Sequence, residues 1–252
     1  MRQAERLSFI LERLATSGAV GVVELAAELD VSTASIRRDL QVLSDQRLLS
    51  RTHGGAIAHG VLYELPLRYR SSKNEPEKSQ VAAQAAERVT EGMSVGLTGG
   101  TTTTKVARAI ADIRQLTVVT NSLSIASELA VRPDLKLVVT GGVARSSSYE
   151  LVGPIADRSL ADINLDLAIV GVDGIAADAG LTTHHEIEAQ TNRVLIDRAA
   201  HVIVVADASK IGKVAFARIC EIARVDELIT NESADKAAVA ALAQAGLRVT
   251  TI

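Results

Sequence analysis

The sequence predicts an α/β protein with a small helical domain at its start and a larger domain built on a largely parallel sheet. In the first 58 residues, apolar side chains recur at helical spacing in three short segments. From residue 75 onward, short segments rich in Val and Ile alternate with helical ones, which is typical of a parallel sheet covered on both faces. A stretch without clean periodicity, residues 59–74, separates the two and is expected to be a linker. The predicted domains are therefore 1–58 and 75–252.

Three helices are expected in the first domain. Leu7, Ile10, Leu11 and Leu14 form one apolar face of the first helix. A second short helix is expected at residues 23–29. A third is expected at 32–44, where the hydroxyl of its first residue can accept a hydrogen bond from an exposed backbone N–H.

Two short helices joined by a tight turn are typical of a helix-turn-helix, whose second helix enters the major groove of DNA. Residues 48–58 follow as two short apolar arms around two glycines, which predicts a β-hairpin wing. Arginine can donate two hydrogen bonds to guanine, and Ser or Thr can contact bases or phosphates. The residues expected to contact DNA are Ser32, Thr33, Ser35, Arg37, Arg38, Arg51 and His53. The alternative is a three-helix cap on the larger domain with solvated surface arginines.

The larger domain is expected to contain seven strands and five helices. The strands are expected at 93–97, 116–120, 135–140, 165–170, 202–206, 227–230 and 248–252. The helices are expected at 77–89, 102–111, 122–129, 184–199 and 234–245. Ligands of such sheets bind at the carboxyl ends of the strands.

A Gly-Gly-Thr-Thr-Thr-Thr run at residues 99–104 connects the first of these strands to a helix. Glycines allow close backbone approach, and a helix N-terminus offers free N–H groups, so this loop can hold a phosphate or another anion. It matches neither of the common nucleotide-binding patterns. Taken alone, the loop is also compatible with a plain capped turn. Four other strand ends carry glycines or polar residues, at 121, 141–142, 171–174 and 207–210, and their coincidence at one edge indicates a binding site.

Composition excludes several other classes of protein. The 252 residues carry a formal charge of −3, so net charge alone does not make the chain a nucleic-acid binder. Residues 1–58 hold seven basic and seven acidic side chains, so the acidic excess belongs to the rest. Aromatic residues make up 2%, which argues against stacking of single-stranded bases. Cys220 is the one cysteine and cannot form an internal disulfide.

No cofactor, metal or membrane partner is expected. No apolar run approaches the ~18 residues of a membrane span, and the charged N-terminus does not resemble a secretory signal, so a cytoplasmic protein is expected. His184 and His185 precede Glu186 and Glu188, which makes a metal site conceivable. Adjacent side chains point in different directions, however, so a solvated helix start is the favoured interpretation.

The first domain resembles the N-terminal signature of DeoR-family bacterial transcription regulators. The matching motifs are Val23-Glu24-Leu25, Val31-Ser32, Ile36-Arg37-Arg38-Asp39-Leu40 and Arg51-x-His53-Gly54-Gly55-Ala56. The resemblance implies that Arg37 and Arg38 lie on the DNA-recognition helix.

The second domain resembles the sensor domain of the same family. The motifs are Glu77-Lys78, Gly100-Thr101-Thr102, Val118-Val119-Thr120-Asn121-Ser122, Gly141-Gly142-x-x-Arg145, Val152-Gly153-Pro154, Gly171-x-Asp173-Gly174, Glu188-Ala189 and Asp207-x-Ser209-Lys210. The resemblance implies a fold similar to ribose-5-phosphate isomerase and an effector that is a phosphorylated sugar or related metabolite. The implied effector site comprises Gly100, Thr101, Thr102, Thr103, Asn121, Arg145, Asp173, Glu188 and Lys210. Thr98 and Asn192 depart from the family pattern, where Asp and Lys are usual.

The leading hypothesis is a transcriptional regulator, a repressor of sugar or carbohydrate metabolism genes, that binds double-stranded operator DNA and a sugar-phosphate-like effector. A single wing module has a small interface, so a homo-oligomer, dimer or tetramer, is expected. One alternative is a sugar-phosphate isomerase-like enzyme in which Asp173, Glu188 and Lys210 transfer protons. Another is an interaction module with a degenerate DNA-binding head.

Overall fold

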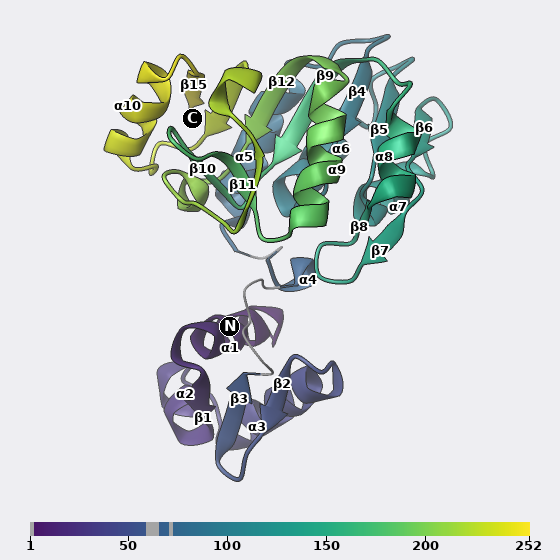
Figure 1. Ribbon diagram of the computed structural model, residues 1–252. Coiled ribbons are helices and arrows are strands. Elements are labelled where there is room, and N and C mark those ends of the chain that lie inside the picture. The colour runs from purple at the N-terminus through teal and green to yellow at the C-terminus, as the bar shows by residue number, and fades with distance from the viewer. Residues whose placement is uncertain (1–2, 59–65, 71–72) are drawn as a thin grey trace. The chain divides into compact units, whose positions relative to one another are not determined.

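The computed structural model describes residues 3–58, 66–70 and 73–252, and it divides into two compact units, Met1–Lys73 and Asn74–Ile252. Each unit has its own hydrophobic core, so each is described by itself (Figure 1).

The first unit begins with three helices and a small antiparallel sheet. The helices are α1 (Gln3–Ser17), α2 (Val22–Glu28) and α3 (Thr33–Asp45), and the strands are β1 (Ala19–Gly21), β2 (Leu49–Arg51) and β3 (Gly55–Ala58) in the order β1-β3-β2. The side chains that face the core are fully buried, among them Ile10, Leu14, Leu25, Ile36 and Leu40. Three helices with a hairpin wing are the predicted arrangement.

A fourth short helix, α4 (Leu67–Arg70), lies in the segment predicted as a linker, and it packs on the first unit. Tyr69 is buried in the core of that unit. Its backbone oxygen accepts a hydrogen bond from the Ser8 hydroxyl, and its own hydroxyl donates to the Gln46 side chain, which follows α3. The rest of the predicted linker, residues 59–65 and 71–72, lies outside the described residues.

The second unit is built on a seven-stranded sheet in which all neighbouring strands are parallel, in the order β15-β14-β12-β9-β4-β5-β6. The strands are β4 (Ser94–Leu97), β5 (Thr117–Thr120), β6 (Lys136–Val139), β9 (Leu165–Gly171), β12 (Ala199–Val205), β14 (Glu227–Thr230) and β15 (Arg248–Thr251). Successive side chains of a strand point to opposite faces. Along β9, Leu167 and Ile169 belong to one core cluster and Ala168 and Val170 to the other, so helices cover both faces.

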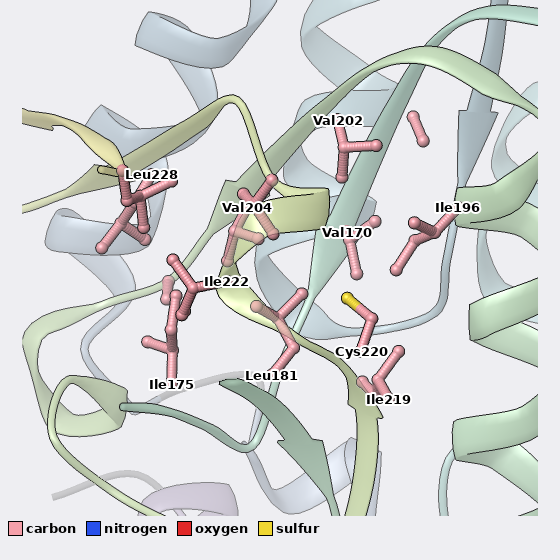
Figure 2. Close-up of a cluster of buried hydrophobic side chains, with 14 of the residues drawn as sticks. Val170, Ile175, Leu181, Ile196, Val202, Val204, Ile219, Cys220, Ile222 and Leu228 are labelled. Carbon is pink, nitrogen blue, oxygen red and sulfur yellow. The ribbon is translucent and has the colours of Figure 1, made fainter. Parts of the chain in front are cut away.

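The two faces carry different helices. α5 (Glu75–Ala86), α6 (Thr101–Ile110) and α7 (Leu123–Leu129) contribute to one cluster, and α8 (Pro154–Leu160), α9 (Glu186–Asp197) and α10 (Lys236–Gln244) to the other. Figure 2 shows the second cluster, where Ile196 of α9 and Cys220 lie near Val170 of the sheet. Two short 3₁₀ helices, Ala208–Lys210 and Ile222–Arg224, complete the unit.

Several short elements were not predicted from the sequence. They are α8, the hairpin of β7 (Val143–Arg145) with β8 (Glu150–Val152), and a three-stranded antiparallel sheet of β10 (Gly174–Ala176), β11 (Gly180–Thr183) and β13 (Ala217–Cys220). The strands among them have three or four residues, which is too short to show a period. The helix expected at 184–199 begins two residues later, at Glu186, because the His185 side chain caps it, and residues 199–201 belong to β12. None of the helices in the described ranges is long and apolar enough to cross a membrane.

Candidate functional site

Helix α3, the predicted recognition helix, has a buried face and an exposed one. Ile36 and Leu40 point into the core and are fully buried, whereas Arg37 and Arg38 are exposed. Ser32 precedes the helix, and its hydroxyl accepts a hydrogen bond from the Ser35 backbone N–H at 3.2 Å. The predicted cap is therefore present. Thr33 and Ser35 are half-buried on the same first turns.

The wing brings a further arginine to this helix. Arg51 of β2 is exposed, and its Nη1 donates to the Gln41 side chain on α3 at 2.6 Å. His53 is exposed in the turn between β2 and β3. The structure therefore connects Arg51 to the recognition helix, and Gln41, which the sequence did not single out, makes the connection.

The carboxyl ends of all seven parallel strands lie at one edge of the large sheet. The polar strand ends predicted at 99–104, 121, 141–142, 171–174 and 207–210 begin within two residues of the ends of β4, β5, β6, β9 and β12 respectively. Because these strands are parallel, the polar segments that follow them lie at the same edge of the sheet, as predicted.

The loop before α6 depends on a glycine. Gly100 has φ +137°, a conformation that L side chains rarely adopt, and it forms the N-cap of α6. Its carbonyl accepts hydrogen bonds from the hydroxyls of Thr103 and Thr104, at 3.1 and 2.6 Å. These hydroxyls therefore brace the loop. Thr101 and Thr102 start the helix, half-buried and buried respectively.

Four of the predicted effector residues form one chain of contacts. Arg145 Nη1 lies 2.9 Å from Glu188 Oε2, and Lys210 Nζ lies 3.3 Å from Asp173 Oδ1. The Thr183 hydroxyl joins the two pairs, at 2.7 Å from Glu188 Oε1 and 3.1 Å from Asp173 Oδ2. These side chains come from β7, α9, β11, the loop after β9 and the loop after β12. Thr183 was missed because the short strand that carries it gives no signal in the sequence.

The chain of contacts lies next to the glycine loop. A Cβ on Gly171, at the end of β9, would lie 3.1 Å from the Gly99 carbonyl oxygen, and the Thr98 hydroxyl accepts a hydrogen bond from the Gly171 N–H at 3.0 Å. Asp173 follows two residues later. Thr98 is fully buried and ties the ends of β4 and β9 together.

Asn121 is also fully buried at this edge. Its Nδ2 donates to Glu150 Oε2 at 3.0 Å and lies 3.4 Å from Asn192 Oδ1, while its own Oδ1 is buried with no hydrogen-bond partner among the described residues. Glu150 also covers Gly99, where a Cβ would lie 2.2 Å from Glu150 Oε1. Glu150 is a second residue that sequence patterns did not indicate, because its position on β8 depends on the fold.

The two adjacent histidines take different roles. His185 Nδ1 accepts a hydrogen bond from Ile187 N at 3.3 Å at the start of α9, and His184 Nε2 lies 3.9 Å from Asp173 Oδ1. No group of three or more His, Cys, Asp or Glu residues in the described ranges could hold a metal ion.

A winged helix-turn-helix unit followed by an α/β unit with a polar sheet edge defines a class of DNA-binding regulators with a sensor domain. The DeoR-like helix-turn-helix domain matches residues 6–59, and the DeoR C terminal sensor domain matches residues 73–232. The chain belongs to the DeoR family of transcriptional regulators.

Curated relatives agree with this assignment over nearly the whole chain. The Glycerol-3-phosphate regulon repressor of Escherichia coli is 33% identical over 92% of this chain and 92% of its own length. HTH-type transcriptional regulator GlpR of Haloferax volcanii is 35% identical over 99% and 98%. HTH-type transcriptional repressor CsqR of Escherichia coli is 33% identical over 88% and 85%. These relatives are named as regulators and not as enzymes, so the isomerase-like alternative is set aside.

Among solved structures, a ribose 5-phosphate isomerase A from Methanocaldococcus jannaschii matches 55% of this chain and 55% of its own, at 21% identity and a TM-score of 0.41. A likeness of this size supports no conclusion about activity.

Proposed function

We propose that the protein represses genes of sugar or carbohydrate metabolism. A phosphorylated sugar or related metabolite bound in the second unit controls its affinity for operator DNA. The observation that carries the proposal is the chain of contacts through Arg145, Glu188, Thr183, Asp173 and Lys210, next to the glycine loop before α6. It brings two cations and two carboxylates together, and Asp173 lies two residues after Gly171, which approaches Gly99 of the glycine loop.

This arrangement suits a ligand with one anionic end and several hydroxyls. Backbone N–H groups at the start of α6 and the nearby cations attract a phosphate. The carboxylates of Asp173 and Glu188 accept hydrogen bonds from sugar hydroxyls. A ligand phosphate would compete with Glu188 for Arg145, so ligand binding would break or rearrange the Arg145–Glu188 ion pair.

DNA recognition is assigned to the exposed side of α3 and to the wing. Arg37 and Arg38 would enter the major groove, with Ser32, Thr33 and Ser35 at the start of the helix and Arg51 and His53 on the wing. One such module buries too little surface for strong specificity, so we expect a dimer or tetramer on repeated half-sites. Effector and DNA would then each change the other's affinity by the same factor.

The DNA half of the proposal is tested with a duplex selected from a random pool by the wild-type protein. Arg37→Ala and Arg38→Ala should each weaken binding, by about 10-fold if one base contact worth about 1–3 kcal/mol is lost. Arg13→Ala is the matched control, because Arg13 lies on α1 and pairs there with Glu24 and Glu28. Equal binding by all three variants would overturn the assignment of α3.

The effector half is tested by thermal shift against a panel of sugar phosphates that includes glycerol 3-phosphate. A ligand at 100 times its dissociation constant stabilises the folded protein by about 2.7 kcal/mol. Lys210→Ala should abolish the shift and the ligand's effect on DNA binding, whereas Lys213→Ala, an exposed lysine on the same loop, should not. A shift that survives Lys210→Ala would place the effector elsewhere.

A further inference from the structure

Gln41, on the exposed side of α3, joins an arginine of the wing to a carboxylate of the same helix. Its Oε1 accepts a hydrogen bond from Arg51 Nη1 at 2.6 Å, and its Nε2 donates to Asp45 Oδ1 at 2.7 Å. All three side chains are exposed, and all three belong to the first unit. They form a chain of two hydrogen bonds, Asp45–Gln41–Arg51, which we call the relay.

The relay lies on the same face of α3 as the two arginines assigned to DNA. Residues three and four positions apart are neighbours on the surface of a helix. Gln41 follows Arg38 by three positions and Arg37 by four, and Asp45 follows Gln41 by four. The relay therefore extends the row of exposed side chains that starts with Arg37 and Arg38, and it ends on the wing.

The backbone of the wing is held against α3 without the relay. Leu49 of β2 is 2% exposed and belongs to the same core cluster as Leu40 and Leu43 of α3. β2 also pairs with β3 along its whole length. Substitutions of exposed side chains away from the core change stability little. The relay is therefore not needed for the fold, and what it fixes is the position of the Arg51 side chain.

Asp45 determines which way the Gln41 amide points. An ionised carboxylate can only accept hydrogen bonds, and a guanidinium can only donate them. Gln41 satisfies both neighbours in one orientation only, with its amino group toward Asp45 and its carbonyl oxygen toward Arg51. The carboxylate therefore presents an acceptor to Arg51 through the amide, at a fixed place on the helix.

The amide also leaves the charge of Arg51 available. Within residues 3–58, 66–70 and 73–252, Arg51 forms no ion pair, and Gln41 takes up one of its five N–H groups. A direct pair with Asp45 would neutralise the guanidinium, whereas a neutral amide holds it and leaves the other donors free. A long side chain that is held before binding also loses less conformational freedom when DNA arrives.

We propose that Gln41 is a positioning residue for DNA binding: with Asp45 behind it, it holds the Arg51 guanidinium beside α3, where the guanidinium contacts a backbone phosphate. A phosphate is the expected partner because the strands that border the major groove flank the helix inside it, and contacts to phosphates fix a protein's register on the duplex. The inference deepens the assignment of the wing to DNA and rests on it.

The experiment measures binding of the full chain to the selected duplex and to an unrelated one, by fluorescence anisotropy between about 50 and 200 mM salt. Arg51→Ala should reduce the slope of log affinity against log salt by about 0.9 for each protomer bound, as loss of one phosphate contact does. Gln41→Met keeps the length of the side chain and removes both hydrogen bonds. It should weaken binding to both duplexes equally, by about 2- to 10-fold, the factor for ordering one long side chain.

A double-mutant cycle separates positioning from other roles of Gln41. Gln41→Met should have no further effect in the Arg51→Ala background. Gln46→Met is the matched control, because Gln46 contacts Arg68 and Tyr69 of α4 instead of the wing, so any effect of this variant should be the same in both backgrounds.

Three results would overturn the inference. If Gln41→Met leaves affinity unchanged while Arg51→Ala lowers affinity and slope, positioning fails and the wing assignment stands. If the loss in Gln41→Met persists in the Arg51→Ala background, or is confined to the selected duplex, Gln41 acts on its own, through the stability of α3 or by reading a base. If Arg51→Ala changes neither affinity nor slope, the wing assignment fails as well.

Discussion

Arg6 of α1 and Asp39 of α3 form a two-point ion pair, with Nε 2.8 Å from Oδ2 and Nη2 3.2 Å from Oδ1. Asp39 is 1% exposed and also accepts a hydrogen bond from Gln3. The hydrogen bond to Asp39 raises the pKa of Arg6. The pair fixes the recognition helix against α1 on the side that faces away from Arg37 and Arg38.

Arg6→Ala should lower the free energy of unfolding of the first unit by about 3 kcal/mol, because it leaves the Asp39 carboxylate buried without its cation. Hydrogen exchange of α3 amides in the full chain measures this. Arg13→Ala is the control, since its contacts to Glu24 and Glu28, at 3.5 and 3.3 Å, are exposed. Exposed pairs contribute less than about 1 kcal/mol. Equal loss of protection in both variants would contradict the role of the buried pair.

The wing depends on a close backbone contact at Gly55. A Cβ at Gly55 would lie 1.9 Å from the Val20 carbonyl oxygen, whereas a Cβ at Gly54 would have no atom within 4 Å. Gly55→Ala should therefore push β3 away from β1 and destabilise the unit by about 1–3 kcal/mol. Gly54→Ala should be nearly silent. Thermal unfolding and hydrogen exchange of residues 49–58 distinguish the two, and similar behaviour of both variants would refute the contact.

The recognition helix and the large sheet could be predicted because their signals are local. The Ser32 cap and the apolar spacing of α3 lie within a few residues of one another, and six of the seven sheet strands begin and end within one residue of the expected positions. The seventh, β12, starts three residues early, at Ala199, because β9 pairs with it there.

The candidate effector site could be predicted only in part. Arg145, Asp173, Glu188 and Lys210 were named from the resemblance to the family's sensor domain, and the structure brings them into one chain of contacts. Thr183, which joins them, lies on a short strand that exists only because it pairs with β10 and β13. Such pairings depend on residues far away in the sequence, and no local pattern records them.

Cys220 provides a chemical probe of the second core. It is the one cysteine of the chain, and burial raises the pKa of its thiol to about 11. At pH 8 roughly 0.1% is thiolate, the reactive form. A disulfide reagent such as DTNB should therefore modify the native protein at least about 100-fold more slowly than the unfolded protein. With increasing urea the rate should follow opening of the core around Val170 and Ile196. Rapid modification in buffer would show that this core opens readily.

Glu227, at the start of β14, should make the second unit sensitive to acid. Burial acts to raise its pKa, but hydrogen bonds from Arg88 and Thr250 outweigh burial, and the pKa is lowered from 4.5. Because the pKa of Glu227 is lower in the folded state than in the unfolded state, the ionised carboxylate stabilises the folded state at pH values above the unfolded pKa. This stabilisation is lost as pH falls through the folded pKa. Glu227→Gln should lower the free energy of unfolding at pH 7 by about 1.5–3 kcal/mol, since it weakens hydrogen bonds to a charged group. The difference between wild type and variant should shrink below pH 4.5. Urea denaturation at pH 7 and at pH 3.5 measures both, with exposed Glu232→Gln as the control. A difference that stays constant with pH would show that Glu227 does not titrate in this range.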